Sequence, residues 1–261
     1  MPILPKIKLP FYYYFLILSL FLMGMVGCAP SQNAVYQSLK AAYVGQEQPI
    51  ESATLNPKYR YMRVEFAGRP ALLVLGYVDE VNGYPVESWY SANNELIQLK
   101  NGRLAGTAGL DFNWINVRYS QDIPLENAIV LRSDLSPADL HSKTAARKSA
   151  AIVYQRKHTL MPDYRAEIEE TVFLEALSEP PNDVPSRDLA RLNLKQIHWV
   201  QERIRPQFND PQNAGLLPLT AYYALDTSTS PARVVYGRQC LAPDYCLSWQ
   251  VWPPLNKAAR L

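Results

Sequence analysis

The sequence predicts a mainly β protein: a single antiparallel β domain, built as a sandwich or an incomplete barrel with a few short helices. Short segments of alternating or continuous apolar residues recur between residues 59 and 252, and turn sequences such as Asn101-Gly102 separate them. Strands do not alternate with long helices, which argues against a parallel α/β fold. The composition of 21 Pro, 11 Gly and 17 Tyr also favours an ordered, loop-rich β protein over a helix bundle.

The first half of the domain is expected to consist of short strands joined by tight turns. In Tyr59–Phe66, apolar Met62 and Val64 alternate with charged neighbours, as in a strand with one buried face. Ala71–Val78 is a nearly continuous apolar run, so it is predicted to be a central, buried strand. Further strands are expected over Glu87–Ala92, Glu95–Lys100, Arg103–Thr107 and Phe112–Tyr119.

The second half is expected to begin irregularly and to end in a meander. A helical turn or two is predicted over Tyr36–Tyr43, and Ser136–Asp139 has the sequence of a helix start, with Pro at the first helical position. Leu189–Arg205 fits neither period cleanly and is predicted to be a long strand. The remaining strands are expected over Ala150–Arg156, Tyr164–Leu177, Leu217–Ala224, Arg233–Cys240 and Leu247–Trp252, which gives ten or so in all.

The first 28 residues are typical of a lipoprotein signal. Lys6 and Lys8 precede the apolar run Phe11–Val26, and small residues lead from it to Cys28. This arrangement resembles a bacterial lipobox, which implies a diacylglycerol thioether on Cys28 and an acylated mature N-terminus. A transmembrane anchor is the alternative, although the run is shorter than the roughly 20 residues that span a bilayer core. Ala29, in place of Asp, favours the outer membrane by resemblance to bacterial lipoproteins.

The chain is therefore expected to have three parts: a signal peptide over residues 1–27, a lipidated N-terminus and tether over 28–57, and the β domain over 58–261. Removal of residues 1–27 takes away two lysines and lowers the formal net charge from +2 to zero. No strong attraction to nucleic acid is expected from such a chain, and its attachment to the membrane is expected to come from lipid.

With lipid on Cys28, a single pair of cysteines remains. Cys240 and Cys246 flank a turn-like stretch that contains Pro243 and Asp244. A disulfide is expected between them in an oxidising compartment, and two free cysteines on adjacent strands are the alternative. Their spacing, without a nearby histidine, is a poor metal signal. No metal and no cofactor are expected.

The search for catalytic residues gives no candidate. The sequence has no G-x-S-x-G, P-loop or H-E-x-x-H motif, and its three histidines lie far apart. A glycoside hydrolase would need two carboxylates facing each other across a cleft. Glu167 and Glu169 share one face of a predicted strand, which is more typical of a solvated surface. The protein is therefore predicted not to be an enzyme.

Aromatic side chains are the more informative group. Most of them are expected to pack in the core, because strand aromatics bury large areas. One or two at a sheet edge could instead stack on sugar rings or line a pocket for acyl chains. The residues concerned are Trp89, Tyr90, Trp114, Trp199, Trp249 and Trp252.

Several short motifs follow one another along the chain in a distinctive order. They are Tyr61–Val64, Leu75-Gly76, Trp89-Tyr90-Ser91, Asn101-Gly102-Arg103, Thr107–Leu110, and Tyr236–Gln239 preceded by Tyr222-Tyr223 and Asp226. This order behind a lipobox resembles the YjbF / GfcB family of outer-membrane lipoproteins, which are associated with group 4 capsule and related exopolysaccharide production. The resemblance implies a periplasm-facing, non-catalytic accessory factor in capsule or exopolysaccharide secretion or assembly. Its implied partners are an outer-membrane polysaccharide export protein and the polysaccharide itself.

Trp89, Tyr90 and Arg103 are the candidates for contact with a glycan or a partner. Arg103 could bind an acidic group, although an ordinary exposed surface charge is the stronger expectation. An alternative function is a carrier of lipids or other amphiphiles that is anchored to the outer membrane. A dry apolar cavity would favour the carrier, and a polar, aromatic-lined groove would favour the glycan role.

Overall fold

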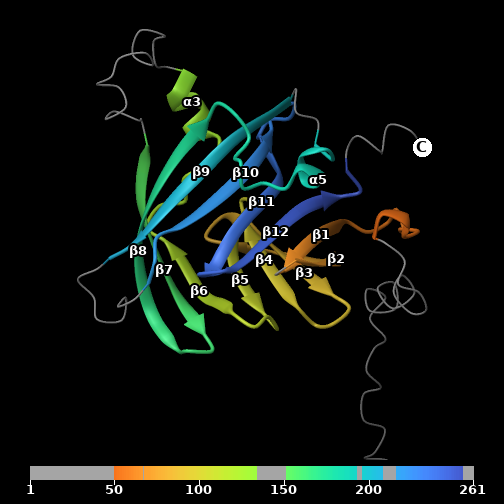
Figure 1. Ribbon diagram of the computed structural model, residues 1–261, viewed down its shortest axis with the longest axis horizontal. Helices are drawn as coiled ribbons and strands as arrows, with labels where there is room; N and C mark the ends of the chain where they lie inside the picture. The colour runs from red at the N-terminus through yellow and green to blue at the C-terminus, as the bar shows by residue number, and fades with distance from the viewer. Residues whose placement is uncertain (1–49, 67, 134–150, 193–195, 208–215, 255–261) are drawn as a thin grey trace, which may run out of the picture.

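The computed structural model describes residues 50–66, 68–133, 151–192, 196–207 and 216–254 (Figure 1). Within them, twelve strands form one antiparallel sheet. The strands are β1 (Tyr61–Phe66), β2 (Arg69–Val81), β3 (Tyr84–Ser91), β4 (Leu96–Lys100), β5 (Arg103–Ala108), β6 (Asn113–Tyr119), β7 (Ile152–Met161), β8 (Arg165–Leu177), β9 (Ile197–Pro206), β10 (Leu219–Asp226), β11 (Arg233–Ala242) and β12 (Tyr245–Trp252). Three short helical segments accompany them: η1 (Ile50–Ser52), α3 (Asn127–Ser133) and α5 (Ser186–Leu189).

The sheet curls into a nearly closed barrel (Figure 1). Each strand pairs with its neighbour in sequence, except that β12 returns to pair with β1, and β5 and β6 lie at the two ends of the strand order. These ends are joined across the seam: the Trp114 N–H donates to Thr107 Oγ1 at 3.0 Å, and the Tyr119 hydroxyl donates to the Leu104 carbonyl at 2.9 Å. The predicted antiparallel β fold is confirmed, and of the two forms considered it is the barrel.

The alternation of residues along each strand decides which side chains fill the barrel. On β1, Met62, Val64 and Phe66 point into a large apolar core that continues through all the strands. Helix α3 places Ala128 in the same core. The Arg132 guanidinium, at the end of this helix, donates to the Ala176 carbonyl of β8. No helix within the described ranges is long and apolar enough to cross a membrane.

Two segments cover the outside of the barrel wall and bury a second layer of apolar side chains. Ile50 and Leu55 pack against outward-facing residues of β1, β2 and β12, including Trp252. Val184 and Leu192 pack against a separate outer cluster on β9, β10 and β11. Part of the expected tether, residues 50–57, thus lies against the barrel.

Ion pairs hold these two covering segments to β1. Arg63 of β1 lies 3.8 Å from the Asp188 carboxylate of α5, which also pairs with Arg191 at 2.9 Å. Arg191 reaches Glu51 of η1 at 2.7 Å. The outer wall at β1 is therefore enclosed from two directions.

Two strand predictions are wrong in their extent. The run Ala71–Val78 is buried mainly at Leu72–Val74, whereas Tyr77 and Val78 are exposed, because β2 shifts register after Leu75 and continues in a solvent-exposed hairpin with β3. The long strand predicted over Leu189–Arg205 begins only at Ile197.

The strand β9 starts late because a short helix, α5, occupies the beginning of the predicted stretch. The Pro185 carbonyl accepts from the Asp188 N–H at 2.8 Å and starts this helix. Helix α3 was not anticipated within the irregular stretch after Pro124. The helical segments predicted at Tyr36–Tyr43 and Ser136–Asp139 lie outside the described residues.

Candidate functional site

The centre of the barrel holds a buried ion pair. Arg103 projects inward from β5, and its Nε donates to Glu202 Oε1 of β9 at 2.6 Å. Its Nη1 donates to the Ile123 carbonyl at 2.6 Å. The hydroxyls of Tyr154 and Tyr223 also donate to the Glu202 carboxylate. Glu202 is fully shielded from solvent, and this pairing offsets the free-energy cost of burying its charge.

The pKa values of this cluster follow from its burial and charge. Burial is the largest single effect on Arg103 and opposes its charged form, but Glu202 and the surrounding tyrosines together outweigh it and raise the arginine pKa. Burial and the nearby Glu202 carboxylate raise the pKa of Tyr154. Burial raises the pKa of Tyr119 to about 12, against the opposing effect of the nearby arginines. Burial also raises the pKa of Tyr223. All three tyrosine hydroxyls around the ion pair therefore stay protonated and act as donors.

A second buried ion pair joins β7 and β8. Arg156 donates to Glu170 Oε2 from both Nε (2.8 Å) and Nη2 (2.5 Å), and His158 Nδ1 lies 3.4 Å from the same oxygen. Burial alone would raise the pKa of Glu170, but Arg156 and His158 outweigh it and lower the pKa to about 2. Burial also lowers the pKa of His158. The Trp114 ring packs on both side chains, 4.3 Å from the Arg156 guanidinium and with its centroid 4.1 Å from that of the His158 imidazole.

These side chains fill the described part of the barrel interior. Trp114, Arg156 and Tyr223 are each at most 1 % exposed and project into it from different strands. A cavity of about 20 Å³ beside His158 and Glu170 has room for about one water. An interior crossed by ion pairs and filled in this way offers an acyl chain no dry apolar space, so it does not favour the amphiphile carrier.

The four glutamates inside the barrel and on β8 give no catalytic arrangement. Glu202 and Glu170 are each neutralised by an arginine inside the barrel. Glu167 pairs with Arg118, and Glu169 with Lys157, on the partly exposed surface that the sequence predicted for these two glutamates. Among the described residues, no three His, Cys, Asp or Glu side chains are grouped as metal ligands.

The candidate contact residues from the sequence do not form one site. The expected exposure of Arg103 is wrong, since this residue is 5 % exposed and sits inside the barrel. Trp89 is also buried, at 3 % exposure. Only Tyr90 is accessible, on the outer face of β3. The three residues therefore cannot share a surface contact.

Tyr90 forms an aromatic pair on the outer wall. Its ring lies over Gly76, where an added Cβ would approach Tyr90 Cδ2 to 2.7 Å, so a side chain at position 76 would displace it. Its hydroxyl donates to that of Tyr77 at 3.3 Å, and the two ring centroids are 6.1 Å apart. Burial, followed by the hydrogen bond to Tyr77, raises the pKa of Tyr90 to about 12. Sequence reasoning missed Tyr77 because it was assigned to a buried strand.

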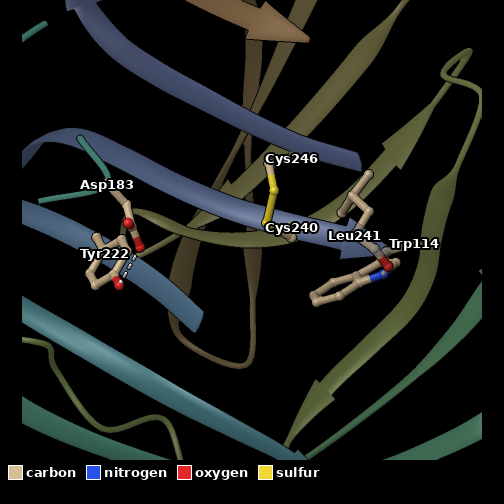
Figure 2. The surroundings of a disulfide bond; sticks show 6 residues. All are labelled: Trp114, Asp183, Tyr222, Cys240, Leu241 and Cys246. Atoms are coloured by element: carbon tan, nitrogen blue, oxygen red, sulfur yellow. Dashed lines mark hydrogen bonds between the residues drawn. A yellow bond between two sulfur atoms is a disulfide. The ribbon is translucent and has the colours of Figure 1, made fainter. Parts of the chain in front are cut away.

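The five tryptophans are core residues, as predicted for most of the aromatic side chains; none is more than 5 % exposed. Trp114 donates from Nε1 to the Leu241 carbonyl at 3.0 Å (Figure 2). Beside Leu241, Cys240 of β11 and Cys246 of β12 lie opposite each other and form a disulfide (Figure 2). It closes the last hairpin of the sheet. Cys28 lies outside the described residues, so its lipidation stays a prediction.

A groove of about 360 Å³ opens on the outer wall beside β9 and β10. The loop after β8 forms one side, and Gln201 and Tyr222 form the floor. The Tyr222 hydroxyl donates to Asp183 Oδ2 of the loop at 3.1 Å (Figure 2). Sequence analysis did not find this groove, because its lining comes from three separate segments of the chain and none of them carries a motif. The cluster of prolines at 180, 181 and 185 was the only local signal. We call this feature, lined by residues 177–183, Gln201 and Tyr222, the outer groove.

Comparisons with known proteins agree on one family. A family model described as "Group 4 capsule polysaccharide lipoprotein gfcB, YjbF" matches residues 37–175. The "Uncharacterized lipoprotein GfcB" of Escherichia coli strain K12 is 28 % identical over 123 residues, which cover 45 % of this chain. The match spans about half of that relative, 54 % of its length.

A solved structure shares the fold. The crystal structure of the hypothetical lipoprotein YmcC from Escherichia coli K12 superimposes with a TM-score of 0.50, over 95 % of this chain and 98 % of that one, at 17 % identity. None of these descriptions names a catalytic activity. With more than half of its length matched by the family model, the chain belongs to the YjbF family of group 4 capsule polysaccharide lipoproteins.

Proposed function

We propose that this protein is a lipid-anchored accessory factor, on the periplasmic side of the outer membrane, in the secretion or assembly of a capsule or exopolysaccharide. The match to the capsule lipoprotein family carries the proposal. The sequence supports the anchor through the basic start, the apolar run and Cys28. Three acyl chains on one residue would exceed the two signals that stable anchoring requires.

The structure supports a non-catalytic role for the domain. Its interior is occupied by the Arg103–Glu202 and Arg156–Glu170 pairs, so neither carboxylate is free to move a proton for a substrate. Recognition of a polymer or an export protein is therefore assigned to the outer surface of the barrel.

A deletion of the gene tests the proposal, with surface and secreted polysaccharide quantified after complementation. We expect loss of polymer in the deletion, recovery with the wild-type gene, and no recovery with Cys28→Ser. Fractionation of the membranes on a density gradient should place the wild-type chain with the outer membrane and release the Cys28→Ser chain. Unchanged polymer in the deletion strain would refute the proposed function.

An incubation of the purified protein with the polymer tests the non-catalytic part. The chain length of the polymer, followed by size-exclusion chromatography, should stay constant. Shortening of the polymer that disappears in a Glu179→Gln or Asp183→Asn variant, which changes a carboxylate of the outer groove, would instead show a hydrolase.

A further inference from the structure

We propose that the outer groove binds a sugar unit that carries no acidic group, either neutral or amino-bearing, from the polysaccharide that the protein serves. This inference rests on the proposed function for the identity of the polymer. The geometry and chemistry of its lining indicate that the groove is a binding site.

The size and position of the groove suit a segment of a chain. At about 360 Å³ it lies at the lower end of the range for small-molecule sites. It is open along the barrel wall, with Ser178, Glu179, Asn182 and Asp183 exposed on its loop side. An open groove admits a unit in the middle of a polymer, whereas a closed pocket would admit only a free end.

The lining offers the groups that a sugar requires. The carboxylates of Glu179 and Asp183 accept hydrogen bonds from hydroxyls, and the amides of Asn182 and Gln201 both donate and accept. Hydrogen bonds to a charged carboxylate are the stronger kind. Apolar surface for the C–H face of a sugar ring comes from Leu177, Pro180, Pro181 and the ring of Tyr222.

The charge of the groove selects against acidic sugars. Its lining contains two carboxylates and no cationic side chain. The guanidinium of Arg203, which follows Gln201 on the same face of β9, is already held by Glu175 at 2.7 Å. Arg238 of β11 is paired opposite Tyr222 in the ladder, so two carboxylates outnumber this one neighbouring cation. A uronic acid would therefore be disfavoured, whereas an amino sugar would be attracted.

The groove is formed in advance of any ligand. Val184 is 4 % exposed and anchors the loop in the outer apolar cluster that includes Tyr222. The Val184 N–H donates to the Pro181 carbonyl at 3.1 Å, and the Tyr222–Asp183 bond fixes the far side. Prolines at 180 and 181 restrict the backbone further. Binding therefore loses little conformational entropy from the loop.

The test uses oligosaccharides released by partial hydrolysis from the surface polysaccharide of the producing cell. Anion exchange separates them into an acidic fraction and a fraction that carries no acid. Saturation-transfer NMR and calorimetric titration then measure binding to the mature chain with Cys28→Ser. We expect the non-acidic fraction to bind and the acidic fraction not to bind.

Three variants locate the site. Asp183→Asn removes one carboxylate, and Gln201→Ala removes one amide; each should weaken binding by about tenfold, the equivalent of about 1.4 kcal/mol. Asp163→Asn is the matched control, because Asp163 is also exposed but lies in the β7–β8 turn, at the opposite end of β8. Equal far-UV circular dichroism and equal unfolding midpoints confirm that the variants are folded.

The proposal is overturned if neither fraction binds, if the acidic fraction alone binds, or if Asp183→Asn and Gln201→Ala bind as the control does. These results are separable from the proposed function. A deletion that loses polymer while the groove binds no sugar leaves the accessory role and refutes the groove. Sugar binding in the groove, together with unchanged polymer in the deletion strain, would support the groove and refute the accessory role.

Discussion

Replacement of Arg103 by methionine is expected to destabilise the barrel strongly. The change keeps most of the side-chain length but leaves the fully buried Glu202 carboxylate with only tyrosine hydroxyls as donors. Breaking a buried ion pair on one side costs about 3–5 kcal/mol, because a charge stays buried without compensation. For a domain of this size, each kcal/mol lowers the unfolding midpoint by about 2–4 °C, so a fall of about 6–20 °C is expected.

The assay is urea and thermal unfolding of the mature Cys28→Ser chain, followed by tryptophan fluorescence. Arg118→Met is the matched control, because Arg118 pairs with Glu167 on the surface, where both side chains are more than half exposed. An exposed pair contributes about 0–1 kcal/mol. The double variant Arg103→Met/Glu202→Met removes both charges and should recover most of the lost stability. If Arg103→Met lowers the free energy of unfolding no more than Arg118→Met does, the Arg103–Glu202 pair does not stabilise the barrel as argued.

Three further outcomes are expected. The folded-state pKa of Glu170, about 2, lies below its ordinary value of 4.5, so the stability it contributes is complete above pH 4.5 and is lost as the pH falls toward 2; a Glu170→Gln variant should show a shallower loss in that window, and an unchanged slope would contradict this. Reduction of the Cys240–Cys246 disulfide should cost about 2 kcal/mol in urea unfolding, as closure of so short a loop predicts; equal midpoints with and without reductant would argue against it. Gly237→Ala would place a Cβ 2.2 Å from the Trp249 indole, so a loss of about 1–3 kcal/mol and an altered near-ultraviolet spectrum are expected, and wild-type values of both would refute the close contact.

The sequence was a good guide to the strands, because their signal is local. Met62 and Val64 alternate with charged residues within a few positions, and Asn101-Gly102 marks a hairpin without reference to the rest of the chain. It could not distinguish a barrel from a sandwich. That choice depends on β12 pairing with β1 across most of the domain, and no local pattern records such a pairing.

The sequence was a poor guide to the site for a related reason. Arg103 follows a turn and has the composition of a surface residue, but Glu202, 99 positions later, draws it into the interior. A buried charge with a distant partner looks like an exposed one until the fold is known. The outer groove is hidden in the same way, since the loop at Asp183 meets Tyr222 only after β9 and β10 have paired.

The pairing of the last strand with the first has a consequence for how the chain matures. A polypeptide that crosses a membrane from its N-terminus delivers β1 early and β12 last, so β1 must wait for almost the whole domain before its second neighbour arrives. Contacts between such distant segments make folding slow. During the wait, unpaired strand edges are open to association with other chains. A stop codon upstream of Tyr245 would remove β12 and leave the edges of both β1 and β11 permanently unpaired. The absence of these eight strand residues would therefore prevent the whole barrel from forming.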